Sequence, residues 1–173
     1  GLHNLIHKAT EYKVLNKGNG TLVLSFTVES QAPNAARIKG GTSSGKNSIE
    51  ELTDRKFGSN DFKFITNQIW TVYPDGSIEL QSSITSNRSS LVLPRLGYVM
   101  KVPQQYSNFT YYGRGPVDNY ADRKSGQFIE QYTNTVAGEF VNFPKPQDMG
   151  NHEDVRWCAL TNQAGNGAVF VAT

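Results

Sequence analysis

Apolar and polar residues alternate along much of this chain with the two-residue period that is typical of β-strands. The run TLVLSFTVES, residues 21–30, is one example, and its β-branched and aromatic residues favour a strand. Two further runs, residues 62–73 and 77–86, flank Pro74-Asp75-Gly76 and predict an antiparallel hairpin. Proline presets the backbone of a tight turn, and glycine accepts the positive φ that many such turns require. Alternation divides the first run between two faces, with Ile69, Thr71 and Tyr73 on one and Trp70 and Val72 on the other.

Strand-like runs continue to the end of the chain at the spacing of roughly ten residues that is typical of a β-sandwich or barrel. They cover residues 91–102, 108–113, 127–135, 155–162 and 168–173. Only one short stretch, NSIEELTDRK (residues 47–56), has a spacing that favours a helix. No internal repeat or low-complexity linker interrupts the pattern. We therefore predict one all-β domain over residues 1–173.

Composition argues against several classes of function and leaves the predicted all-β fold unchanged. The net charge of +2 at pH 7 is too small to indicate a nucleic-acid partner or an anionic membrane surface. No apolar run approaches the length of a membrane-spanning helix, and no charged segment followed by an apolar one opens the chain. The single cysteine, Cys158, excludes an internal disulfide and a zinc site built from cysteines. We therefore predict neither a nucleic-acid nor a membrane partner.

Two motifs for bound groups are incomplete. GGTSSGKN, residues 40–47, is close to a phosphate-binding loop, but Asn47 stands where a Ser or Thr should hold magnesium. We interpret it as a surface loop. His3 and His7 have the spacing that can ligate zinc on a helix, but no acidic partner stands beside them. We therefore predict no cofactor and no metal in this chain.

Acidic residues in loop-like segments are the remaining catalytic candidates. Glycoside hydrolysis needs two carboxyl groups that face each other across the scissile bond. Each acidic residue here also has an Arg or Lys nearby in the sequence, so structural ion pairing is the alternative. The residues alone leave a carbohydrate-related role open. The candidates are Asp118, Asp122, Asp148, Glu153 and Asp154.

The segment NHEDVRW, residues 151–157, allows two interpretations. In one, it is a polar loop that contacts sugar, with Trp157 as a stacking platform. In the other, Trp157 is a core residue of a strand and Arg156 pairs with a neighbouring carboxylate. Alternation places Val155, Trp157 and Ala159 on one face, which favours the second interpretation.

We call residues 111–126, YYGRGPVDNYADRKSG, the glycine-rich corner. It is either a loop that binds a ligand or a structural corner between strands. Gly113 and Gly115 allow backbone conformations that are closed to other residues, and Pro116 stiffens the exit, so the structural interpretation is favoured. Charged side chains of the corner can bridge to neighbouring loops or to another domain through charge-assisted hydrogen bonds. These side chains are Arg114, Asp118, Asp122 and Arg123.

Two motifs, in the same order, resemble the small-chain module of family 2 β-galactosidases. The first is a proline-arginine-hydrophobic-glycine strand, residues 94–97, followed by a corner of the pattern Trp/Tyr-Tyr-Gly-x-Gly-Pro-x-Glu-x-Tyr-x-Asp-Arg. The second, Pro-Gln-Glu-x-Gly-x-x-x-Asp-x-Arg-Trp, resembles residues 146–157. The departures are mild: Val117-Asp118 and Ala121 differ from the usual residues of the corner, and Asp148 stands where glutamate is usual. The matching corner residues are Tyr112, Gly113, Gly115, Pro116, Asn119, Tyr120, Asp122 and Arg123.

The resemblance implies a large antiparallel β-sandwich, the supersandwich of galactose mutarotase-like proteins, incomplete at its C-terminal end. In this family the acid/base and nucleophilic glutamates come from a separate barrel domain. The chain is therefore expected to be an excised accessory domain of a β-galactosidase that packs against the barrel, helps to complete the sugar site and is not catalytic alone. The implied partners are the other domains and, in the full-length enzyme, a β-galactoside substrate. The implied parent is cytoplasmic or periplasmic.

Two other functions stay open. One is a stand-alone carbohydrate-binding module. The other, less favoured, is a mutarotase-like aldose epimerase, which would need a histidine and a carboxylate converging in one pocket. The apolar strand that ends at Thr173 predicts self-association of the isolated chain through an exposed sheet edge. The candidate residues for carbohydrate binding or for a domain interface are Tyr112, Arg114, Asp118, Tyr120, Asp122, Arg123, His152, Glu153 and Arg156.

Overall fold

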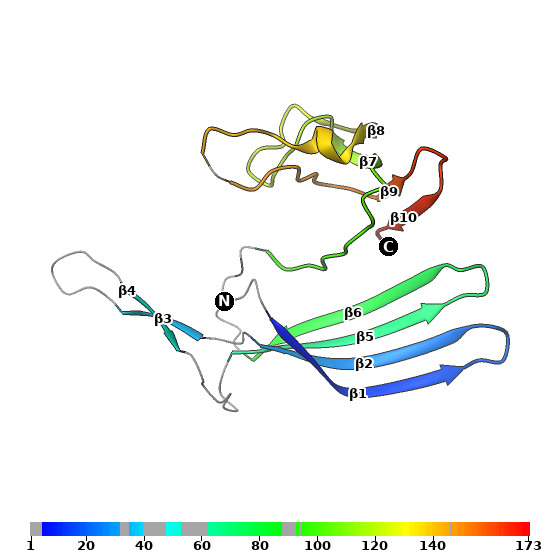
Figure 1. The fold of residues 1–173 in the computed structure, drawn as a ribbon. Helices are drawn as coiled ribbons and strands as arrows, with labels where there is room; N and C mark the ends of the chain where they lie inside the picture. The colour runs from blue at the N-terminus through cyan, green and yellow to red at the C-terminus, as the bar shows by residue number, and fades with distance from the viewer. Residues whose placement is uncertain are drawn as a thin grey trace. The chain divides into compact units, whose positions relative to one another are not determined.

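The computed structural model describes residues 5–31, 35–39, 48–52, 62–87, 93, 95–145 and 147–173 (Figure 1). Their regular structure consists of β-strands and one short 3-10 helix, so the chain is all-β, as predicted. No helix in this part of the chain is long and apolar enough to cross a membrane. The chain divides into two compact units, Gly1–Arg95 and Leu96–Thr173. Each contains an antiparallel four-stranded sheet, which is consistent with the predicted all-β sandwich.

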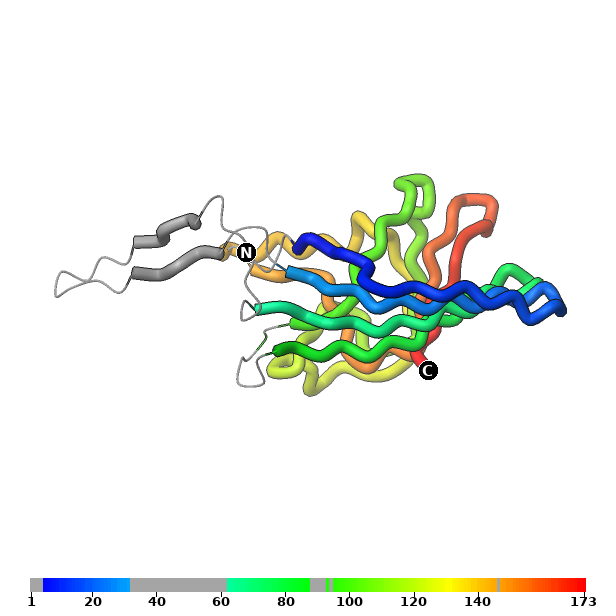
Figure 2. The backbone as a smooth tube through the Cα atoms, turned by 90° about the horizontal axis from the view of Figure 1, so that it is seen from below, coloured from blue at the N-terminus to red at the C-terminus, as the bar shows by residue number. Residues whose placement is uncertain are grey.

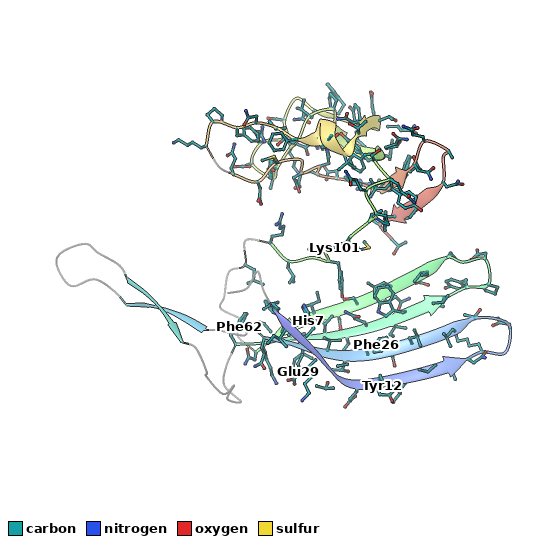
Figure 3. The ribbon with its side chains drawn as sticks, viewed as in Figure 1. His7, Tyr12, Phe26, Glu29, Phe62 and Lys101 are labelled. Carbon is teal, nitrogen blue, oxygen red and sulfur yellow. The ribbon has the colours of Figure 1, made fainter. Side chains whose placement is uncertain are left out.

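The sheet of the first unit has the strand order β1-β2-β5-β6, with every neighbouring pair antiparallel (Figure 2). The prediction for residues 21–30 is confirmed as β2, whereas the edge strand β1 was not predicted. Figure 3 shows Tyr12 and Phe26 on β1 and β2, where the strand register pairs them. The strands are β1 (Ile6–Asn16), β2 (Leu22–Gln31), β5 (Phe64–Val72) and β6 (Ile78–Ser86).

The predicted hairpin is confirmed as β5 and β6. At its turn Gly76 has a φ of 86°, and the Tyr73 N–H donates to the Ser77 carbonyl over 2.9 Å. The register sets Trp70 opposite Leu80 on one side and Leu24 on the other. Side chains that are opposite each other in register share a face, so Trp70 shares a face with Leu80 and Leu24.

A small two-stranded sheet pairs β3 (Ala35–Lys39) with β4 (Ser48–Leu52). The helix predicted over residues 47–56 is therefore wrong where the structure describes it. Ile49 and Leu52 have a helix-like spacing, but Ile49 pairs with Ile38 across the ladder, and tertiary pairing overrides so short a pattern. The loop of residues 40–47 lies outside the described residues, as does His3. His7 lies in β1, where its Nδ1 is 2.8 Å from the Ser30 hydroxyl.

The sheet of the second unit has the order β10-β9-β7-β8, again antiparallel. Four of the predicted strands are confirmed here, and the 3-10 helix η1 (Val136–Glu139) follows β8. The strand predicted over residues 91–102 is wrong in its described part, since residues 95–102 pair with no described strand. The strands are β7 (Asn108–Gly115), β8 (Phe128–Thr135), β9 (Trp157–Thr161) and β10 (Gly167–Val171).

The centre of this unit is Tyr111 on β7, whose side chain is completely buried. Its ring stacks on Phe109 with 5.1 Å between centroids and lies 5.5 Å from the Tyr132 ring. The His152 ring covers it at 4.1 Å. This aromatic cluster lies at the start of the glycine-rich corner, whose first residue is Tyr111.

Candidate functional site

The glycine-rich corner begins on β7 and turns at Gly115-Pro116, whose peptide bond is cis. Its first two glycines are needed for close packing. Neither Gly113 nor Gly115 has a positive φ, so the prediction that they adopt backbone conformations closed to other residues is wrong. A Cβ on Gly113 would lie 2.9 Å from Val155 Cα, and one on Gly115 would meet the Tyr111 hydroxyl and the Tyr132 ring. Glycine is required because two layers of chain touch there.

Asn119, completely buried, holds the corner together. Its Nδ2 donates to the carbonyls of Arg114 and Val117 over 2.8 and 3.0 Å and to Gln127 Oε1 over 3.1 Å. Its Oδ1 accepts from the Glu153 N–H over 2.7 Å. The backbone of Asn119 also exchanges hydrogen bonds with Asn151. One buried amide thus ties residues 114–119 to residues 151–153, which fully satisfies its polar groups.

Arg114, near the end of β7, forms an ion pair with Asp154 of the segment 151–157. Its Nε and Nη2 both approach Asp154 Oδ2, at 2.8 and 2.7 Å, and its Nη1 donates to the Gln127 carbonyl. The hydrogen bond from Arg114, together with the charges of Lys124 and Arg156, lowers the pKa of Asp154. Asp154 also has a φ of 56°, which few residues other than glycine adopt. The ion pair joins β7 to the segment 151–157, which agrees with the interpretation that these acidic residues form structural ion pairs.

His152 forms a second connection, between η1 and β7. Its side chain is only 3% exposed, and its Nε2 lies 2.7 Å from Glu139 Oε2 on η1. Its Nδ1 lies 3.1 Å from the Arg114 carbonyl. Glu139 in turn accepts from Asn134 Nδ2 over 2.7 Å. Both ring nitrogens of His152 therefore have protein partners.

Arg123 lies on the outer side of the corner. It pairs with the buried Asp118 over 3.2 Å, and its guanidinium lies 5.3 Å from the Tyr120 ring centroid and 5.4 Å from that of Phe143. Burial, followed by the charge of Asp118, raises the pKa of Tyr120. The Tyr120 hydroxyl oxygen is buried and has no hydrogen-bond partner within the described part of the chain.

An open pocket of about 510 Å³ lies beside this stack, and we call it the Tyr120 pocket. Aromatic rings, two carboxylates, an amide and a guanidinium line it. The lining residues are Tyr120, Asp122, Arg123, Phe143, Gln147 and Asp148.

The other predicted site residues do not line this pocket. Tyr112 is 40% exposed and pairs in register with the half-buried Trp157. Trp157 is thus neither a fully buried core residue nor a free platform. Glu153 accepts from Asn151 Nδ2 and lies 3.7 Å from Lys124. Arg156 is exposed, and its N–H donates to the Tyr112 carbonyl.

Sequence reasoning did not single out several residues that build this arrangement. Asn119 was noticed only as part of a motif, and the others lie in polar stretches that look like ordinary surface loops. Only a signal for burial would have identified them, and a single polar residue in a loop carries none. The missed residues are Asn119, Gln127, Glu139, Phe143 and Asn151.

Comparison with known proteins decides the family. The family model described as "Beta galactosidase small chain" matches residues 9–173. The chain belongs to the β-galactosidase small-chain family. The resemblance seen in its sequence motifs is therefore confirmed.

Relatives of this small-chain domain include several proteins named β-galactosidase. The chain is 33% identical over 98 residues to the β-galactosidase of Priestia megaterium, and the aligned residues cover 57% of the chain and 10% of the relative. It is 32% identical over 91 residues to β-galactosidase BgaC of Bifidobacterium adolescentis, covering 53% and 9%. It is 31% identical over 112 residues to the β-galactosidase of Kluyveromyces lactis, covering 63% and 11%. The aligned part of the chain spans about a tenth of each relative.

Proposed function

We propose that this chain is an accessory domain of a larger β-galactosidase that hydrolyses terminal β-galactosides. In that enzyme it packs against the catalytic domain and helps to complete the sugar site. The observation that carries the proposal is the family match over residues 9–173. The aligned part of the chain spans only about a tenth of each β-galactosidase relative, so the relatives are much longer proteins.

The bonding of the glycine-rich corner supports a structural contribution. Asp118 and Asp154 pair with Arg123 and Arg114, and Asn119 is saturated with hydrogen bonds. Carboxylates committed in this way are poorly placed to flank a glycosidic bond. We therefore assign no catalytic role to Asp118 or Asp154, and the proposal expects the catalytic glutamates on another domain of the larger enzyme.

An aldose epimerase is a weaker candidate. His152 and Glu139 are a histidine and a carboxylate within hydrogen-bond distance, as such chemistry needs. However, the ring is buried against Tyr111, and its second nitrogen is engaged by the Arg114 carbonyl. Neither residue lines the Tyr120 pocket. The pair thus lacks access to a sugar.

Titration of the 173-residue chain with galactose and lactose tests the carbohydrate-binding alternative. We expect no saturable change in Trp157 fluorescence up to high-millimolar sugar, and no heat in calorimetry. A Trp70→Phe variant removes the signal of the first unit. Saturable binding would instead support a stand-alone carbohydrate-binding module. Polarimetry on the same samples tests the epimerase, which accelerated mutarotation would support.

Self-association of the isolated chain is a further expectation of the proposal. β10 pairs only with β9 among the described strands, so it is an edge, and its Val169 and Val171 are 63% and 66% exposed. Unpaired apolar edges recruit other chains. Light scattering should show a mass that increases with concentration, and Val169→Lys should reduce that increase. A monomer at every concentration would contradict the expectation.

A further inference from the structure

The tripeptide Gly-Asn-Gly occurs twice in this chain, at residues 18–20 and 165–167. Both copies lie at the turns of antiparallel hairpins, and both asparagines are exposed. In an Asn-Gly pair the glycine nitrogen can attack the side-chain amide carbon of the asparagine, because glycine has no Cβ that hinders the approach. The structure holds the two copies differently, so their reactivity should differ.

The first copy leaves the reacting groups free. Asn19 lies between β1 and β2, and no described residue hydrogen-bonds to its main chain or to the Gly20 N–H. Its side-chain Oδ1 accepts from the Thr21 N–H over 3.1 Å. This oxygen gains negative charge when the amide carbon becomes tetrahedral, so the Thr21 N–H is placed to stabilise the intermediate.

The second copy is held by hydrogen bonds on both sides of its asparagine. The Asn166 N–H donates to Asn162 Oδ1 over 3.0 Å, and the Asn166 carbonyl accepts from the Asn162 N–H over 2.8 Å. Gly167 is the first residue of β10 and pairs in register with Thr161. Attack on the side chain requires rotation of the peptide between asparagine and glycine, so these hydrogen bonds must open first.

We propose that Asn19 is a site of spontaneous deamidation in the folded chain and that Asn166 is protected. The Gly20 nitrogen bonds to Asn19 Cγ, the Cγ–Nδ2 bond breaks, and the proton of the Gly20 N–H leaves with Nδ2 as ammonia. Water then opens the succinimide at either carbonyl and yields aspartate or isoaspartate. The product adds a carboxylate at the turn that the hydrogen bond from the Lys17 N–H to the Thr21 carbonyl closes. The reaction needs only water, so it is independent of what the larger enzyme hydrolyses.

The test incubates the 173-residue chain in mildly alkaline buffer, folded and in urea, and follows both asparagines by peptide mass spectrometry. Deamidation raises the mass of a peptide, and chromatography separates its isoaspartyl and aspartyl forms. The urea sample is the matched reference, because both asparagines have glycine on either side there. We expect the ratio of the folded rate to the urea rate to be at least about fivefold larger at Asn19 than at Asn166, the factor that one main-chain hydrogen bond of ordinary strength contributes.

Two variants separate the contributions. Asn162→Ala removes the side-chain acceptor of the Asn166 N–H and should raise the rate at Asn166 severalfold without changing the rate at Asn19. Asn19→Gln should abolish isoaspartate formation in the first turn. Far-UV circular dichroism verifies that each variant is folded, and the wild-type comparison is decisive without them. Equal rate ratios at the two asparagines, a larger ratio at Asn166, or aspartate without isoaspartate at Asn19 would overturn the inference.

Discussion

Replacement of Asn119 by alanine should lower the free energy of unfolding of the second unit by about 3–5 kcal/mol. The substitution removes three hydrogen bonds donated by Nδ2 and one accepted by Oδ1. It also leaves the Glu153 N–H without its acceptor and opens a cavity where no side chain atom is exposed. Buried polar groups that lose their partners cost more than the bonds themselves contributed.

The variant Asn119→Asp separates the contribution of the Asn119 hydrogen bonds from that of its side-chain volume. Aspartate keeps the shape of asparagine and an acceptor for Glu153, but it sets an oxygen against three acceptor oxygens. We expect it to destabilise at least as strongly as alanine. Chemical denaturation in the Trp70→Phe background reports the second unit through Trp157. Asn166→Ala, in an exposed turn, is the control and should change stability by less than about 0.5 kcal/mol. A loss below about 1 kcal/mol for Asn119→Ala would refute a central role for this amide.

Gly115→Ala should destabilise the same unit by about 2–3 kcal/mol, the usual scale of overpacking in a rigid core. Its Cβ would lie 2.7 Å from Tyr132 Cδ2 and would also meet the Tyr111 hydroxyl. Neither ring can retreat easily, because Tyr111 is completely buried and Tyr132 donates to the Gly115 and Phe128 carbonyls.

Gly97→Ala is the matched control for this change, since a Cβ there would meet no atom within 4 Å and the residue has no positive φ. It should be neutral or slightly stabilising through the unfolded state. Thermal unfolding followed by near-UV circular dichroism compares the two variants. Equal stability of both would mean that the close approach at Gly115 does not constrain the corner.

The hairpin and most strands could be predicted because their signals are local. Pro74 and Gly76 mark the turn, and the register of β5 and β6 follows from alternation on either side. β1 escaped prediction because its alternation is broken by a bulge between Ala9 and Glu11. β4 was mistaken for a helix because its pairing with β3 depends on the partner strand rather than on its own spacing.

The site could be predicted only in outline. The sequence indicated that charged residues of the corner bridge to other loops, and Arg114 and Arg123 do so. It could not select Asp154 as the partner of Arg114, since 40 residues separate them. Nor could it show that Asn119 is buried, because the turn that buries it depends on Asn151 and Glu153 in a distant loop. The motif, in contrast, carried the family assignment.

The most direct test of the proposed accessory role is a hydrolysis assay with a chromogenic β-galactoside. It compares three samples. The first is the 173-residue chain alone, the second is the full-length polypeptide encoded by the gene that contains it, and the third is that polypeptide with the 173-residue segment removed. The proposal predicts no hydrolysis by the chain alone, hydrolysis by the long polypeptide, and its loss when the segment is removed. Hydrolysis by the chain alone, or full activity without the segment, would contradict it.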